Sequence, residues 1–126
     1  MNLPLLDQVV PALLEDLDAR GLFDSTLVVV MGEMGRTPKI NGSAGRDHWP
    51  QCGFSLLFGG GTRQGLVYGK TDKIGQWPTL NPVSPADLVA TFYQLMGIDP
   101  HLAVPDRSGR PIPIAHGGEP ISDLIA

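Results

Sequence analysis

The stretch that most constrains the fold of this chain is the run of residues 26–31 (Thr-Leu-Val-Val-Val-Met), which is uncharged and mostly β-branched. Such a run is typical of a strand covered on both faces in a parallel sheet, rather than of a strand with one face in water. In open α/β sheets, ligands bind outside the carboxyl ends of the strands. The run therefore predicts a buried strand that leads into a functional loop.

Charged and polar side chains gather in the loop beyond this run. Glu33 and Arg36 lie just past its carboxyl end, and Asp47 and His48 follow in the same loop. This loop runs over about twenty residues, and loops longer than about 12–15 residues in a compact domain are usually functional or disordered. The plainer interpretation of Glu33 and Arg36 is an exposed salt bridge, which stabilises a fold little. Asp47 can equally cap the loop, and His48 can be a structural histidine hydrogen-bonded beside Trp49.

Two helices are predicted. Residues 6–17 place apolar side chains on one helical face and acids on the other, and Gly21 is a natural stop. Pro11 lies inside this helix, where we expect a bend. The second helix has the clearer start, because Ser84 is an N-cap residue followed by a proline and then, three residues after the cap, by an acid. Gly97 ends its apolar stripe.

The remaining elements predict the fold class. Residues 54–58 indicate a second buried strand, residues 66–68 a short third strand, and residues 121–125 a final helical turn. The order of elements predicts an α/β fold, with a mostly parallel sheet flanked by helices and with long loops. Two or three strands and two helices make a thin sheet to stand alone. We therefore expect residues 1–126 to be an incomplete part of a single domain.

Composition excludes several classes of partner. The chain has 126 residues and a net charge of −4, which gives no reason to expect nucleic acid or an anionic membrane as a partner. No apolar run approaches the roughly 20 residues that a membrane span needs. Cys52 is the one cysteine, so no disulfide forms within the chain. It is most simply a small residue at the edge of the core.

Four segments carry a resemblance to a known family. They are residues 26–41, which include Gly-Glu-Met-Gly-Arg-Thr-Pro, residues 45–50 (Gly-Arg-Asp-His-Trp-Pro), residues 57–61 (Leu-Phe-Gly-Gly-Gly) and residues 84–91 (Ser-Pro-Ala-Asp-Leu-Val-Ala-Thr). These segments closely resemble the carboxyl-terminal part of the DUF1501 proteins. Those proteins look like members of the alkaline phosphatase and sulfatase superfamily. The resemblance implies a partial alkaline-phosphatase-like fold, with the amino-terminal half of the domain as the expected partner.

The resemblance also implies roles for individual residues. Glu33 takes the place of a metal-binding acid, although the superfamily has aspartate there, followed by a histidine or asparagine where this chain has Met34. His48 is similar in place to a metal-binding histidine that precedes the next buried strand. Asp47 would bind the metal or orient His48. Arg36 would bind an anionic ester oxygen and so act in catalysis.

The implied cofactor is a divalent metal such as zinc or calcium, which polarises an ester oxygen and activates a bound nucleophile. Three hypotheses about function follow. The first is a metal-dependent hydrolase of phosphate or sulfate esters, carried by small molecules or polysaccharides, that is inactive without the other half of the domain. The second is a non-catalytic module that binds a sugar, a cell-surface polymer or a protein, which the altered Glu33–Met34 pair favours. The third is a truncated product without a function of its own.

Overall fold

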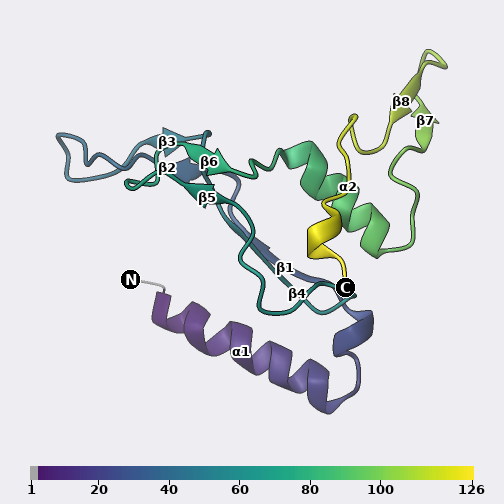
Figure 1. Ribbon diagram of the computed structural model, residues 1–126, viewed down its shortest axis with the longest axis horizontal. Helices are drawn as coiled ribbons and strands as arrows, with labels where there is room; N and C mark the ends of the chain where they lie inside the picture. The colour runs from purple at the N-terminus through teal and green to yellow at the C-terminus, as the bar shows by residue number, and fades with distance from the viewer. Residues whose placement is uncertain (1–2) are drawn as a thin grey trace.

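The computed structural model describes residues 3–126 as two α-helices, two short 3-10 helices and four two-stranded sheets (Figure 1). The helices are α1 (Leu3–Ala19), η1 (Phe23–Ser25), α2 (Pro85–Leu95) and η2 (Ser122–Leu124). The strands are β1 (Val28–Met31), β2 (Gly35–Arg36), β3 (His48–Trp49), β4 (Ser55–Phe58), β5 (Lys70–Thr71), β6 (Pro78–Leu80), β7 (Ala103–Pro105) and β8 (Pro111–Pro113). Each sheet is an antiparallel pair: β1 with β4, β2 with β3, β5 with β6 and β7 with β8.

The predicted fold class, a partial alkaline-phosphatase-like fold with a mostly parallel sheet flanked by helices, is therefore wrong. The two buried-type strands exist, as β1 and β4, but they run antiparallel, with Val28 opposite Phe58 and Met31 opposite Ser55. The connection between them explains the direction, because it folds into the β2–β3 pair and returns the chain beside β1. A parallel pair would need a crossover connection, usually a helix. An apolar run predicts cover on both faces but leaves strand direction open.

The β1–β4 ribbon is apolar on both faces. Residues directly opposite each other share a face, so Val28, Val30, Leu56 and Phe58 lie on one side. Val29, Met31 and Leu57 lie on the other side. Apolar side chains on both faces of the ribbon are consistent with the prediction from the sequence that this strand is covered on both sides.

The predicted third strand at residues 66–68 is wrong. This segment is not extended in any sheet, and the side chain of Val67 is 90% exposed. Gly65 and Gly69 on either side adopt positive φ angles of 68° and 80°, which turn the chain out of the extended conformation. The strand that does form, β5, begins immediately after Gly69.

Both helices end as the sequence predicts. Gly21 has φ +66°, and the N–H groups of Gly21 and Leu22 donate to the carbonyls of Asp18 and Leu17. This is the Schellman arrangement, and Gly97 closes α2 in the same way. Pro11 lies inside an uninterrupted α1, and the bend expected there stays a prediction. Residues 122–124 form the predicted final helical turn as η2.

The best-packed part of the molecule lies where the carboxyl-terminal segment crosses α2. Ala90 and Thr91 of α2 and Ala115 of the segment are almost fully buried. The segment then reaches the end of β4, where the N–H of Arg63 donates to the carbonyl of Leu124. In Figure 1 the yellow chain end accordingly lies between α2 and the β1–β4 ribbon.

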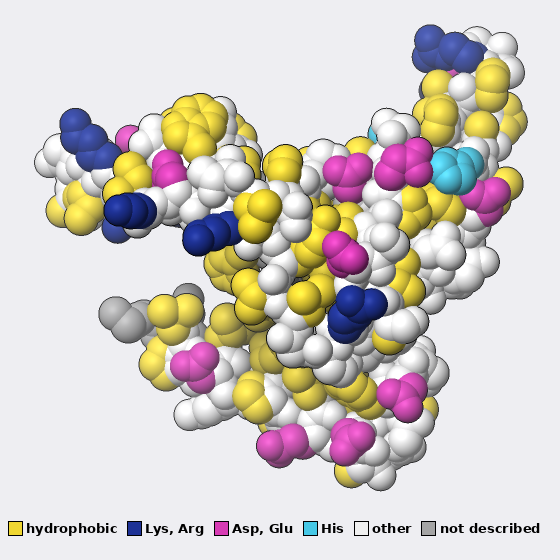
Figure 2. Space-filling model, in the orientation of Figure 1, with side chains coloured by type: hydrophobic (Ala, Val, Ile, Leu, Met, Phe, Trp, Pro, Cys, Tyr) yellow, Lys and Arg dark blue, Asp and Glu magenta, His cyan; other side chains and the backbone are white. Residues whose placement is uncertain are grey.

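Much apolar surface is left uncovered elsewhere. The described chain exposes 9120 Å², whereas a folded monomer of this mass exposes about 6,500 Å². Figure 2 shows hydrophobic side chains along the side of α1 that faces the ribbon. Leu3, Leu5 and Val9 are each 62% exposed. Among residues 3–126, no helix is long and apolar enough to cross a membrane.

Candidate functional site

Arg36 and His48 lie directly opposite each other in the β2–β3 pair. Opposed residues in an antiparallel pair project their side chains from the same face, with Cβ atoms about 4.5–5.5 Å apart. Both side chains are exposed to solvent. A guanidinium and an imidazole are therefore presented side by side, and we call the β2–β3 pair with these two side chains the Arg36–His48 strip.

A close backbone approach holds this strip in place. Gly35 precedes Arg36 on β2, and a Cβ atom at Gly35 would collide with the carbonyl oxygen of Cys52. Only glycine allows the chain that leaves β3 to pass so near β2. The glycine of the Gly-Arg dipeptide is therefore needed for the position of Arg36.

The loop between β2 and β3 is pinned by its own hydrogen bonds. The side chain of Asn41 accepts from the N–H groups of Ser43 and Gly45, each at 3.0 Å, and donates to the carboxylate of Asp47 at 2.8 Å. The Thr37 N–H donates to the Asp47 carbonyl at 2.9 Å, which continues the β2–β3 pairing by one residue. The Asn41 side chain thus caps the turn, and the Asp47 carboxylate holds that side chain in place.

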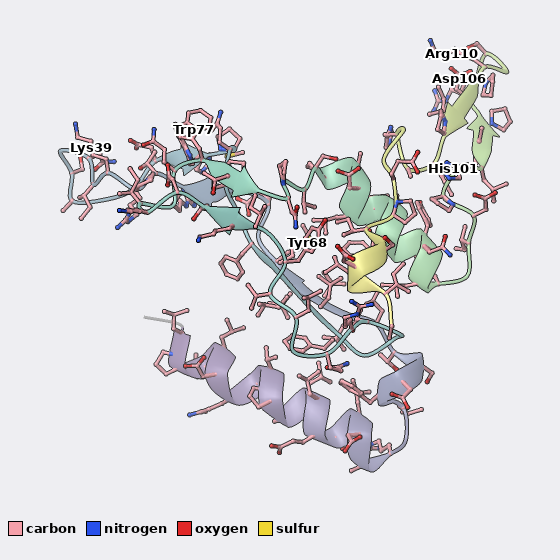
Figure 3. The ribbon with its side chains drawn as sticks, viewed as in Figure 1. Lys39, Tyr68, Trp77, His101, Asp106 and Arg110 are labelled. Atoms are coloured by element: carbon pink, nitrogen blue, oxygen red, sulfur yellow. The ribbon has the colours of Figure 1, made fainter. Side chains whose placement is uncertain are left out.

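A second set of contacts joins the strip to the β5–β6 pair. The indole N–H of Trp49 donates to the carbonyl of Gln76 at 2.8 Å. The rings of Trp49 and Trp77 meet edge to face, with centroids 5.4 Å apart. In Figure 3, Trp77 lies over the strands of this end of the molecule, and Lys39 lies at the far tip of the β2–β3 loop.

Glu33 lies on the bend that connects β1 to β2 and is exposed. Within the described residues its side chain makes no hydrogen bond or ion pair with the protein. The salt bridge between Glu33 and Arg36, the plainer interpretation of the sequence, is accordingly not seen in residues 3–126.

Two carboxylates with perturbed acidity lie away from the strip. The hydroxyl of Ser84, followed by the N–H groups of Glu119 and Ser84, lowers the pKa of Asp87. The hydroxyl of Ser108 and the N–H of Arg110 lower the pKa of Asp106. Both shifts come from structural caps and turns. Close to the strip, burial and the charge of Asp72 raise the pKa of the Cys52 thiol.

Sequence reasoning missed the residues that support the strip. Thr37 and Asn41 pin the loop, and Trp77 and Gln76 brace Trp49. The Asn41-Gly42 dipeptide was an available signal for the turn, because asparagine side chains hydrogen-bond to the backbone two residues on. The contact from Trp49 to Gln76 had no local signal, since it spans 27 residues.

The comparisons with known proteins give one match. The model of the family described as "Protein of unknown function (DUF1501)" matches residues 1–125. The chain belongs to the DUF1501 family. No curated protein and no solved structure matches it.

The metal site implied for this DUF1501 protein is not assembled by the described residues alone. No group of three or more histidine, cysteine, aspartate or glutamate side chains within residues 3–126 could hold an ion. The carboxylate of Asp47 is engaged by Asn41. Successive residues of a strand face opposite sides, so Asp47 and His48 are directed apart. Glu33 and His48 remain predicted ligands, but two side chains do not make a metal site.

Proposed function

We propose that this DUF1501 protein recognises the anionic group of a phosphate or sulfate ester, as part of an ester hydrolase. The observation that carries the proposal is the placement of Arg36 opposite His48 on one exposed face. A guanidinium binds two oxygens of a tetrahedral anion through its planar fork. An imidazole beside it can give a hydrogen bond or a proton to the ester oxygen.

In this proposal each residue has a separate task. Arg36 binds and orients the ester group, and His48 contacts its bridging oxygen. Gly35 and the pinned loop hold the backbones of β2 and β3 together, so that both side chains stay on one face, which favours the bound geometry. A divalent metal would need ligands beyond Glu33 and His48. Ser25, Ser43, Ser55 and Ser84 have no motif that marks a nucleophile.

The test measures binding and hydrolysis separately. Titration with inorganic phosphate and sulfate, followed by backbone amide NMR shifts, should perturb β2 and β3 first. Arg36→Lys should weaken binding about tenfold, because a lysine cannot form the bidentate contact. Arg63→Lys is the matched control, since Arg63 is exposed and lies outside the strip. Equal losses in the two variants, or no shift in β2 and β3, would remove the basis of the proposal.

Hydrolysis is followed with p-nitrophenyl phosphate and sulfate, with zinc or calcium added. Anion binding at the strip without hydrolysis would favour the second function, a non-catalytic binding module. Two observations support that alternative: the carboxylate of Asp47 accepts from Asn41, and residues 3–126 contain no three-ligand cluster. Turnover that depends on Arg36 and His48 would favour the hydrolase.

We also propose that residues 3–126 form part of a larger folded unit. The excess of exposed surface and the apolar faces of the β1–β4 ribbon and of α1 support this proposal. Covering such surface stabilises a fold by roughly 25 cal/mol per Å². The isolated chain should therefore bind the dye ANS strongly. A monomer in sedimentation that binds no dye would contradict this proposal.

A further inference from the structure

Charge is unevenly distributed along this acidic chain. We define the basic lobe as residues 34–49 and 70–80, which contain the β2–β3 and β5–β6 pairs. The lobe contains five of the nine basic residues of the chain and only two of its thirteen acidic residues, a net charge of +3. The whole chain carries −4, so the remainder carries −7. The five cations are Arg36, Lys39, Arg46, Lys70 and Lys73.

The charges of the lobe are exposed and not neutralised by the protein. All five cations are solvent-exposed, and none forms an ion pair with another side chain of the described residues. The two acids are already engaged: Asp47 accepts from Asn41, and Asp72 accepts from the N–H groups of Ile74 and Gln76. Figure 2 shows lysine and arginine side chains around the β2–β3 end, and acids along α1 and near α2.

The lobe is also a single braced body. The Trp49–Gln76 hydrogen bond and the Trp49–Trp77 ring contact tie the two strand pairs together. Arg46 donates to the carbonyls of Thr37 and Pro38, which fixes the base of the loop that carries Lys39. The cations are thus displayed on a stiff scaffold, and their mutual repulsion is not relieved within the chain.

We propose that the basic lobe binds a linear polysaccharide bearing sulfate groups, and that this polymer carries the ester presented to Arg36. The inference rests on the proposed function, because the same strip lies within the lobe. It deepens that function by naming the substrate class. Lys39, Lys70 and Lys73 bind sulfate groups of the polymer through charge-assisted hydrogen bonds. Trp77 is 47% exposed and offers an apolar face in the same lobe.

Charge density favours this polymer over nucleic acid. A double helix carries one charge per about 1.7 Å of its axis and a broad surrounding field. The negative charge of a double helix would also be repelled by the net charge of −7 on the rest of the chain. A single sulfated chain is only one strand wide and can follow the lobe alone. The lobe is correspondingly small, with five cations rather than an extended basic face.

The experiment compares dextran sulfate with uncharged dextran, by fluorescence of the tryptophans at low and moderate salt. The test variant is Lys39→Gln, Lys70→Gln and Lys73→Gln together, which leaves Arg36 and His48 in place. The matched control is Arg20→Gln, Arg63→Gln and Arg107→Gln together, which removes the same charge from outside the lobe. The test variant should bind about tenfold more weakly, and its salt dependence should fall by about three counterions.

The outcomes separate this inference from the proposed function. Binding of dextran sulfate that the test variant loses and the control retains supports the inference, whether or not any ester is hydrolysed. Equal losses in both variants, no binding, or equal competition by single-stranded DNA of the same total charge would overturn it. Hydrolysis of p-nitrophenyl esters that depends on Arg36, without polymer binding, would retain the proposed function and reject the polymer as substrate.

Discussion

The hydroxyl of Thr91 accepts a hydrogen bond from the N–H of Ile121 at 3.0 Å, across 30 residues of sequence. The same hydroxyl donates to the carbonyl of Asp87 at 2.7 Å, and Thr91 is fully buried. One side chain thus joins the middle of α2 to the carboxyl-terminal segment. Gly118 of the same segment passes so close to α2 that a Cβ atom there would collide with the backbone of Ala86.

Replacing Thr91 by valine keeps the shape but removes both hydrogen bonds. The N–H of Ile121 would then lose its partner at a part-buried site, so the free energy of unfolding should fall by about 1 kcal/mol. Urea denaturation followed by circular dichroism measures the change. Thr71→Val is the control, because Thr71 is exposed, and it should change stability by less than about 0.5 kcal/mol. Equal effects in the two variants would contradict the junction.

Replacing Ser84 by alanine removes the N-cap of α2. Its hydroxyl accepts from the N–H of Asp87, and the Asp87 carboxylate accepts from the N–H of Ser84, which together form a capping box. We expect a loss of about 1 kcal/mol in the same denaturation measurement. Ser43→Ala, in the exposed β2–β3 loop, should have little effect. An unchanged midpoint for Ser84→Ala would show that the cap contributes nothing.

The lowered pKa of Asp87 makes stability depend on pH in one direction. Its carboxylate is held ionised mainly by the Ser84 hydroxyl, so the unfolded chain takes up this proton more readily than the folded chain. The contribution is fully present above the ordinary aspartate pKa of about 3.9 and is lost as pH falls through the lowered value. The Asp87→Asn variant should therefore be less stable at neutral pH, and its free energy of unfolding should fall less steeply as the pH is lowered into the acid range. A dependence on acid pH identical to that of the unsubstituted chain would refute this.

Replacing Gly35 by alanine should disrupt the Arg36–His48 strip. The added Cβ would collide with the carbonyl of Cys52, which is backbone and cannot rotate away. We expect a loss of about 3 kcal/mol, together with loss of anion binding. Gly42→Ala is the control, since nothing lies near a Cβ at that position. Amide NMR spectra distinguish a local change in β2 and β3 from global unfolding.

Replacing Trp49 by phenylalanine removes its hydrogen bond to Gln76 but keeps an aromatic ring. The two strand pairs of the basic lobe should then separate more easily, at a cost of about 1 kcal/mol. Near-ultraviolet circular dichroism should lose the signal of the Trp49–Trp77 ring pair. Trp77→Phe would lose the same signal but retain the Trp49 hydrogen-bond donor. A larger loss of stability in Trp77→Phe would contradict the role given to the hydrogen bond.

Local chemistry let the sequence predict several elements. Ser84 and Gly97 bound α2, and Gly21 closes the turn after α1, because caps and positive φ angles depend on a few adjacent residues. The apolar run before Glu33 is β1, and residues 54–58 contain β4. The sequence also placed Arg36 and His48 in one loop system. The metal roles of Glu33, Asp47 and His48 stay predictions.

By itself, then, the sequence determined the helix ends, the two apolar strands, the family and the candidate side chains. Only the tertiary structure decided that β1 and β4 run antiparallel, that Arg36 lies opposite His48, and that the Asp47 carboxylate accepts from Asn41. The physical reason is the sequence separation over which each interaction acts. Caps and periodicity act over one helical turn, whereas strand direction and cross-strand pairing depend on how a long connection folds back, which no short stretch of residues encodes.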